Sequence, residues 1–152
     1  MTIEQLDFTF VQDQPIRRVL EDYYSQAQKA FDIGSYLGTL VTCGSVVEGL
    51  LTWALLQHKE AAFESKGACK DKTGQVMPLD KWNLTNLIDV GAELNLIGKT
   101  AKQASWAVKD FRNFIHPYNL LQQSARPDQA LAQSALGAVA EIRRSLQGRL
   151  SK

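Results

Sequence analysis

The chain has 152 residues, of which 45% are hydrophobic and 22% are charged, as in an ordinary globular protein with a single core. No apolar run reaches the roughly 18 residues of a membrane-spanning helix, and the first residues lack the basic start and apolar stretch of a secretory signal. The two cysteines, Cys43 and Cys69, fit no metal-binding spacing. We therefore expect a cytoplasmic protein with reduced thiols, no membrane association, no metal and no cofactor.

Apolar residues at spacings of three and four predict five helices after an irregular lead-in over residues 1–14. The helices are expected over about residues 15–33, 36–65, 79–95 or 79–98, 99–116 and 127–150. Residues 66–78 are polar and contain glycine, which predicts a mobile loop, and a second loop follows Pro117 over residues 117–127. The second helix is apolar enough to be central. The sequence thus predicts one all-α domain, an up-and-down bundle with a long central second helix.

Charge is distributed unevenly, although the net charge is only +1. Residues 1–35 carry three basic and six acidic side chains, and residues 36–98 carry five and seven. Residues 99–152 carry nine basic and three acidic side chains. If these basic side chains converge in space they favour a polyanionic partner such as RNA, whereas scattered ones are ordinary helix-surface charges.

One stretch of the basic third contains residue types that can act on a phosphodiester. Arg112 and His116 are four residues apart, so a helix continuing to Pro117 places both on one face. Arginine binds phosphate through two parallel hydrogen bonds, and histidine transfers protons near neutral pH. Asn113 is expected to assist them, and Lys109 and Tyr118 are expected to contact the substrate. The alternative is an exposed arginine and a histidine that only caps the helix end.

A second candidate group lies in the central helix. Glu48 interrupts its apolar face one turn from Ser45, and a carboxylate in such a place needs a partner. Arg112 is the expected partner, because both residues lie beside the predicted contact between the second and fourth helices. Glu48 and Ser45 are therefore interpreted as residues that support Arg112 and His116, or as a structural pair.

The pattern of helices, together with the segment Phe111-Arg112-Asn113-Phe114-Ile115-His116-Pro117, resembles the HEPN superfamily (higher eukaryotes and prokaryotes nucleotide-binding). The resemblance implies a metal-independent endoribonuclease of toxin or antiviral-defence type, in which the RNA's own 2′-hydroxyl is the nucleophile. It also implies a homodimer whose two Arg112 and His116 pairs face one cleft. In that comparison Arg112 stabilises the charge on the phosphorane, and His116 is the general acid or base.

This chain departs from the family motif, because only Asn113, Phe114 and Ile115 separate the arginine from the histidine. The usual spacing is longer. A second hypothesis is therefore a non-catalytic HEPN-like module that dimerises and binds a partner protein, such as an antitoxin, or a nucleotide. A third is a dimerising bundle whose activity resides in another protein.

Overall fold

The structure, a computed structural model, describes residues 6–111, 114, 116–122 and 126–150. In these residues the regular secondary structure is helical, without strands, and one isolated bridge pairs Lys70 with Val76. The helices are α1 (Gln14–Asp32), α2 (Tyr36–Leu56), α3 (Lys59–Glu64), the 3-10 helix η1 (Leu79–Lys81), α4 (Leu84–Glu93), α5 (Lys99–Phe111), α6 (Pro117–Gln122) and α7 (Gln129–Leu150). The predicted all-α class is confirmed.

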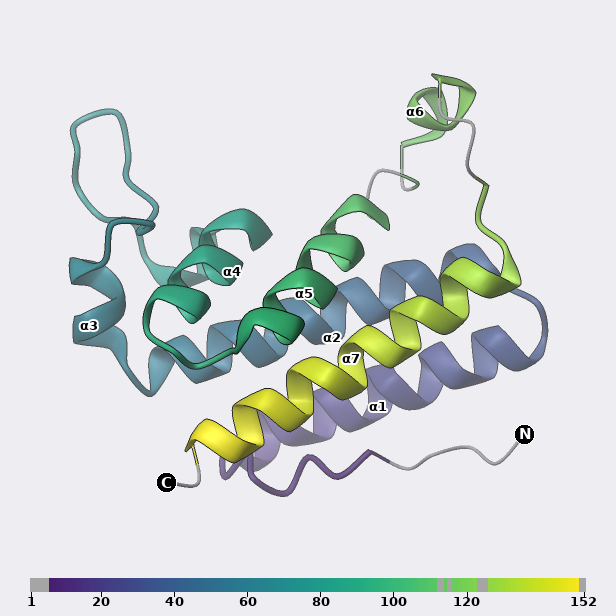
Figure 1. Ribbon diagram of the computed structural model, residues 1–152, viewed down its shortest axis with the longest axis horizontal. Helices are drawn as coiled ribbons and strands as arrows, with labels where there is room; N and C mark the ends of the chain where they lie inside the picture. The colour runs from purple at the N-terminus through teal and green to yellow at the C-terminus, as the bar shows by residue number, and fades with distance from the viewer. Residues whose placement is uncertain (1–5, 112–113, 115, 123–125, 151–152) are drawn as a thin grey trace.

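The long helices α1, α2, α5 and α7 run in alternating directions along the bundle (Figure 1). The turn from α1 to α2 is tight because Gly34 adopts a positive φ of 78°, which a glycine tolerates without steric cost. Its N–H donates to the carbonyl of Phe31, and the N–H of Ser35 donates to the carbonyl of Ala30. These two bonds satisfy carbonyls at the end of α1, so the chain reverses between the first two predicted helices.

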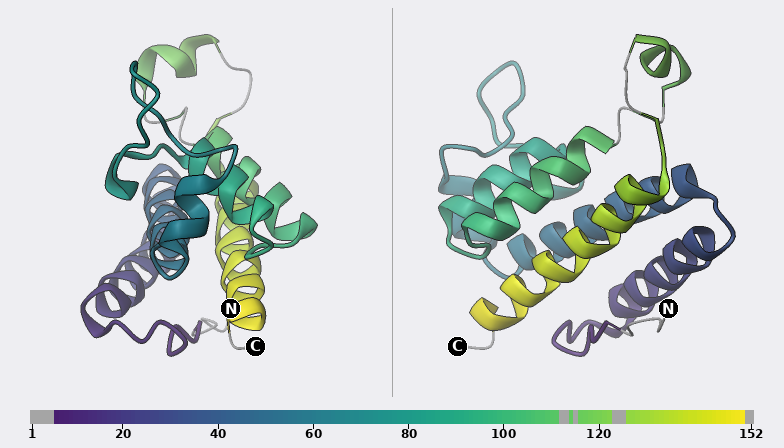
Figure 2. Two further views of the ribbon diagram at one scale, coloured as in Figure 1. Left: turned by 90° about the vertical axis from the view of Figure 1, so that its left-hand side faces the viewer. Right: turned by 45° about the vertical axis from the view of Figure 1, so that its right-hand side comes forward.

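Helix α2 lies at the centre of the bundle and packs against α1, α4, α5 and α7 (Figure 2). Its apolar side chains are therefore buried on several sides, including Leu40, Val47, Leu50, Leu51 and Leu55. Contrary to the expectation from apolar runs, α2 is long and apolar enough to span a membrane over an 18-residue window, with a mean hydropathy of 1.5; 61% of that window is buried inside the bundle. The predicted central role of this segment is confirmed.

The second helix is shorter than predicted. It ends at Leu56, and the separate short helix α3 follows His58, so the expectation of one helix to residue 65 is wrong. The polar run from Gln57 to Glu60 has no apolar side chain that would hold it on the axis of α2. Ala62 of α3 is fully buried, and its packing holds α3 in a direction that differs from that of α2.

The third predicted helix begins later than Pro78. Only the single turn η1 follows this proline, and α4 begins after Asn83. The side chain of Asn83 accepts a hydrogen bond from the N–H of Asn86 (2.9 Å), and the side chain of Asn86 accepts one from the N–H of Asn83 (3.2 Å). This reciprocal capping satisfies two N–H groups that a helix start otherwise leaves without partners.

We expect Asn83→Ala to lower the free energy of unfolding by about 1 kcal/mol, because the exposed Asn83 contributes a cap and little packing. Urea denaturation followed by circular dichroism measures the change. The exposed neighbour Lys81 provides the control, since Lys81→Ala should change stability by less than about 0.5 kcal/mol. Equal effects of the two substitutions would contradict this role of Asn83.

The described part of the lead-in is irregular, as predicted, and it contributes to the core. Phe8 and Val11 are 2% and 0% exposed, and the Phe8 ring packs edge-on against Tyr24 of α1 at 6.0 Å between centroids. Arg143 of α7 donates a hydrogen bond to the carbonyl of Asp7 (3.1 Å). The segment is therefore joined to both the first and the last long helix.

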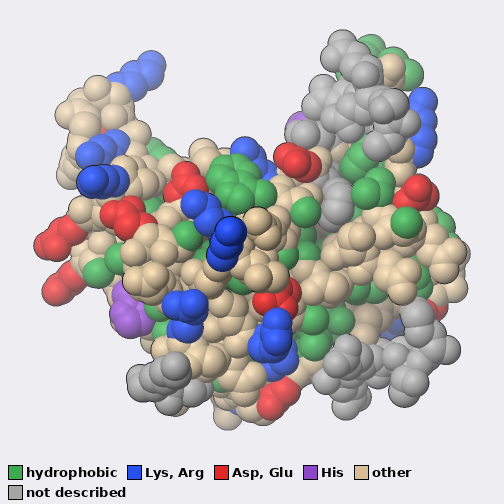
Figure 3. All heavy atoms as spheres, viewed as in Figure 1, with side chains coloured by type: hydrophobic (Ala, Val, Ile, Leu, Met, Phe, Trp, Pro, Cys, Tyr) green, Lys and Arg blue, Asp and Glu red, His purple; other side chains and the backbone are tan. Residues whose placement is uncertain are grey.

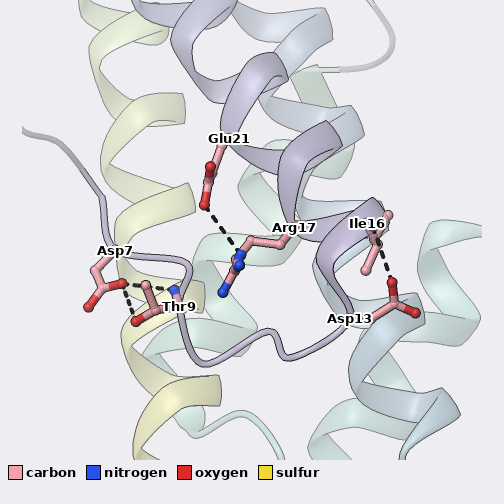
Figure 4. A network of polar contacts seen from close by, with 6 residues as sticks. All are labelled: Asp7, Thr9, Asp13, Ile16, Arg17 and Glu21. Carbon is pink, nitrogen blue, oxygen red and sulfur yellow. Dashed lines mark hydrogen bonds and ion pairs between the residues drawn. The ribbon is translucent and has the colours of Figure 1, made fainter.

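Polar contacts order the approach to α1 (Figure 4). The Asp7 carboxylate accepts hydrogen bonds from the hydroxyl and the N–H of Thr9, and these lower the pKa of Asp7. Asp13 accepts a bond from the N–H of Ile16 and so caps α1, where the sequence predicted a helix start. Arg17 and Glu21 form an i, i+4 pair on the first turns.

The loop over residues 66–78 projects from one end of the bundle (Figure 1) and closes on itself through Asp71. Its carboxylate accepts hydrogen bonds from the hydroxyl and N–H of Thr73 and from the N–H of Gln75, which lower the pKa of Asp71. The ionised form therefore holds the loop at neutral pH, and this contribution disappears as the pH falls through the lowered pKa. The position of the loop is confirmed, and its predicted mobility stays a prediction.

The chain after α5 differs most from the sequence prediction. Helix α5 ends at Phe111, His116 lies in a bend, and Pro117 is the first residue of the short helix α6. A helix to residue 116 and a loop from residue 117 were expected, and both expectations are wrong. Proline fits the first turn of a helix because its fixed φ suits that position and its missing N–H is not needed there.

Candidate functional site

Helix α5 brings the chain toward the candidate site and packs between α2, α4 and α7. Its buried line consists of Ala101, Ser105 and Val108, each at most 1% exposed. The hydroxyl of Ser105 donates to the carbonyl of Ala101 (2.8 Å), so a polar side chain is satisfied inside the core. Of the apolar residues on this helix, Ala101 and Val108 are buried, while Ala104 is only half-buried.

His116 is exposed in the bend between α5 and α6. Arg112 and Asn113 lie outside the described residues, as does Ile115. Since α5 does not continue to His116, the argument that Arg112 and His116 share one helical face is wrong.

Phe114 lies in the turn between α5 and α6 and was not among the predicted site residues. Its side chain is 5% exposed and belongs to the main hydrophobic core. His116 follows two residues later and is exposed, so the chain passes from the core to the surface within this step. Burial and exposure are not visible in the sequence, so the pattern Phe-x-His-Pro alone would not have located this turn.

The two predicted substrate contacts lie on either side of the turn. Lys109, in the last turn of α5, has its ammonium 4.6 Å from the ring centroid of Trp106, which is cation–π contact distance. Tyr118, in the first turn of α6, is 83% exposed. The structure therefore places a cation held by an aromatic ring before His116 and an exposed aromatic ring after it.

Ser45 and Glu48 lie one turn apart on α2, beside a hollow of about 620 Å³. The Ser45 hydroxyl donates to the carbonyl of Val41 (3.2 Å), and Glu48 is half-buried. The hollow is bordered by α1, α2 and the segment around η1, through Asp13, Ile16, Ser45, Glu48, Gly49, Thr52, Trp53, Leu56, Leu79, Asp80 and Trp82. The predicted pairing of Glu48 with Arg112 involves a residue outside the described part and stays a prediction.

On the face shown in Figure 3, Lys and Arg side chains are interspersed with Asp and Glu side chains. On α7, Arg144 pairs with Glu141, and Arg149 donates to the carbonyl of Asn95 (2.7 Å). Arg143 is engaged with the lead-in. These three arginines of α7 are therefore engaged with Glu141, Asn95 and the lead-in.

Other reactive side chains are separate from this turn. In the described part of the chain, no group of three or more His, Cys, Asp or Glu side chains is arranged to hold a metal ion. His58 is exposed at the break between α2 and α3. Both cysteines are free thiols, and burial raises the pKa of Cys43 to about 12.

A thiol reagent should therefore distinguish the two cysteines. We expect iodoacetamide at pH 8 to alkylate the partly exposed Cys69 and to leave Cys43 unmodified in the folded protein, since the thiolate is the reacting form. Mass spectrometry of the digested protein measures the modification. Denatured protein is the control in which both residues react, and rapid labelling of Cys43 under native conditions would refute the expectation.

Comparison of the chain with protein-family models, with curated proteins and with solved structures gave no match in any of the three.

Proposed function

We propose that this protein is a metal-independent endoribonuclease of HEPN-like type, in which Arg112 and His116 act on the RNA. The observation that carries the proposal is the exposed His116 at a turn anchored in the core by Phe114. Lys109 and the exposed Tyr118 flank this turn, so a cation and an aromatic ring are available to contact a nucleotide.

The chemistry requires only groups of the RNA and of the protein. The 2′-hydroxyl loses its proton to an imidazole and attacks the adjacent phosphorus, and the bond to the 5′-oxygen of the next nucleotide breaks. That oxygen leaves with a proton from an acid, which yields a 2′,3′-cyclic phosphate and a 5′-hydroxyl. Arg112 would stabilise the charge that builds up on the phosphorus oxygens, and Asn113 would help to hold them.

The step needs a base and an acid at the same time, which favours two copies of the chain. Within the described residues the His116 side chain makes no hydrogen bond or ion pair that would orient it. A second copy supplies a second His116, so that one imidazole takes a proton and the other provides one. The predicted homodimer is in this way part of the proposed mechanism.

The test is incubation of the purified protein with single-stranded and hairpin RNA in excess EDTA. We expect cleavage fragments that end in a 2′,3′-cyclic phosphate, identified by mass spectrometry. Arg112→Ala should slow cleavage more than Arg112→Lys, because lysine keeps the charge and loses the bidentate geometry. Absence of cleavage on all RNAs, with correctly folded protein, would refute the proposal.

A non-catalytic module that binds a partner protein is the second candidate, and α6 is the observation in its favour. This helix stands apart from the bundle (Figures 1 and 2), and Tyr118 and Leu121 on it are 83% and 75% exposed. They are three residues apart and so share one face. Two results together would support this candidate over the first. The wild type would not cleave RNA, and a co-purifying protein would protect α6 from proteolysis.

A further inference from the structure

We infer that the outward side of α1 is the surface through which two copies of this chain pair, with their α1 helices antiparallel. The inference goes beyond the proposed function, because it assigns the contact to named residues and does not depend on RNA chemistry. Helix α1 lies at an outer edge of the bundle (Figure 2).

Helix α1 carries more apolar surface than its own fold uses. Its inner line, which consists of Leu20, Tyr24, Ala27 and Phe31, is buried against the rest of the bundle. A second line follows the spacing three, four, three, four, three along the outer side, through Ile16, Val19, Tyr23, Gln26, Ala30 and Ile33. This is the spacing of the contact residues in a pair of coiled helices.

The outer line is exposed at Val19, Tyr23, Gln26 and Ile33, whereas Ile16 and Ala30 are half-buried. Val19 is 45% exposed, Tyr23 is 42% exposed, and Ile33 at the end of the helix is 82% exposed. Leu37 at the start of α2 is 41% exposed and lies close to Ile33 along the chain. These four residues are the majority of the large hydrophobic side chains that are exposed in the described part of the protein.

The adjacent edge of α2 extends this surface. Gly38 of α2 approaches Ala30 closely, since a Cβ added to the glycine would lie 3.5 Å from the Ala30 Cβ. Val41, one turn beyond Leu37, is half-buried, and Ser45 follows on the same side. Two neighbouring helices thus present a nearly uncharged surface, which is typical of the centre of a protein interface.

When a second α1 runs antiparallel to the first, the outer apolar residues of one helix face apolar residues of the other. This match identifies a second copy of the chain as the partner. An antiparallel pair in full overlap forms contact layers between the outer positions of the two helices. The layers are Ile16 with Ile33 of the second copy, Val19 with Ala30 of the second copy, and Tyr23 with Gln26 of the second copy. Two-fold symmetry repeats each layer, so apolar residues meet apolar residues at four of six positions.

The charges beside this line favour the same register. Asp22 and Lys29 both lie on the solvent flank of the outer line, seven residues apart and therefore on one side of the helix. In the antiparallel register Asp22 lies across from Lys29 of the second copy, and symmetry produces the pair twice. A parallel arrangement would instead place the two copies of Asp22 on opposite sides of the pair, so this attraction would be lost.

The association is tested on the full chain by sedimentation velocity between about 1 and 100 μM, where the wild type should have twice the mass of one 16.9 kDa chain. Val19→Glu/Tyr23→Glu should weaken association at least about 100-fold, because it buries carboxylates without partners. The fold should be retained, since both side chains are partly exposed in the single chain. Leu121→Glu, at an exposed apolar residue of α6, is the matched control and should remain dimeric.

A charge exchange tests the register. Asp22→Lys should weaken association about tenfold by placing two lysines together, and Asp22→Lys/Lys29→Asp should restore it. Cysteine cross-linking in a Cys69→Ser background gives an independent measure. Ile16→Cys mixed with Ile33→Cys should cross-link, whereas Ile33→Cys alone should not, because its two copies lie about 25 Å apart along antiparallel helices.

Several outcomes would overturn the inference. The first is a wild type that stays monomeric over the whole concentration range. The second is a Leu121→Glu protein that dissociates while Val19→Glu/Tyr23→Glu remains dimeric. The third is efficient cross-linking of Ile33→Cys alone. RNase activity has no part in these measurements. A dimer that cleaves no RNA would therefore refute the proposed function and leave this surface assignment intact.

Discussion

Replacing His116 by alanine is expected to reduce the rate of RNA cleavage by a factor of about 10² to 10⁴, the range for loss of a general acid or base. His116 is exposed in the bend before α6, so its removal should leave the fold unchanged. RNA binding should weaken little, because Lys109, Arg112 and Tyr118 remain. Single-turnover cleavage of a fluorescent RNA, with the melting temperature measured in parallel, determines both effects.

The second histidine of the chain provides the control for this substitution. His58 is also exposed, at the break between α2 and α3, and has no part in the proposed mechanism. His58→Ala should therefore cleave RNA at the wild-type rate. If His58→Ala and His116→Ala reduce the rate equally, or if His116→Ala cleaves as fast as the wild type, His116 is not a reacting group.

Truncation of Leu51 is expected to have the largest effect on stability. Leu51 is fully buried in the central helix, and its side chain approaches Gly91 of α4, since a Cβ added to Gly91 would lie 3.5 Å from a Leu51 methyl carbon. Leu51→Ala leaves a cavity where α2 meets α4. The free energy of unfolding should fall by about 2 to 5 kcal/mol, a large share of the roughly 5 to 15 kcal/mol of a typical domain.

Leu56 is the matched control on the same helix. It is 50% exposed near the C-terminal end of α2, so Leu56→Ala removes the same atoms without opening an enclosed cavity. We expect it to cost less than about 1 kcal/mol in urea denaturation. A Leu51→Ala protein that is as stable as Leu56→Ala would show that α2 is not the central packing element.

Apolar spacing was sufficient to locate the long helices. The first helix was expected over residues 15–33 and is Gln14–Asp32, and the last was expected over residues 127–150 and is Gln129–Leu150. Each of these helices begins next to an aspartate, Asp13 for the first and Asp128 for the last. The carboxylate of each aspartate accepts a hydrogen bond from an N–H in the first turn of its helix. Such capping is local in the chain, and so it can be recognised from the sequence.

The breaks between helices were less predictable, because they depend on packing. No proline or glycine separates α2 from α3, and the break follows from burial of Ala62 in a new direction. Pro117 was interpreted as the end of a helix and is the start of α6. Proline is compatible with both positions, and the neighbouring helices decide between them.

The same limit applies to the candidate site. Residue types alone pointed to Arg112 and His116, and they still support the proposal of an RNase. The helical geometry that was expected to join them is absent, because α5 ends at Phe111 and Phe114 directs the chain into the core before His116 reaches the surface. Charge content predicted a basic C-terminal third, whereas several of its cations on α7 are engaged in contacts within this protein.

The sequence by itself determined the all-α class, the bounds of the first and last helices and the central position of α2, because these depend on periodicity and capping within short stretches of chain. Only the tertiary structure decided where the middle helices end and that His116 lies in an exposed turn. It also decided which of two apolar lines on α1 faces inward. The physical reason is that burial is shared between distant segments, so neither helix ends nor exposed faces are properties of one segment alone.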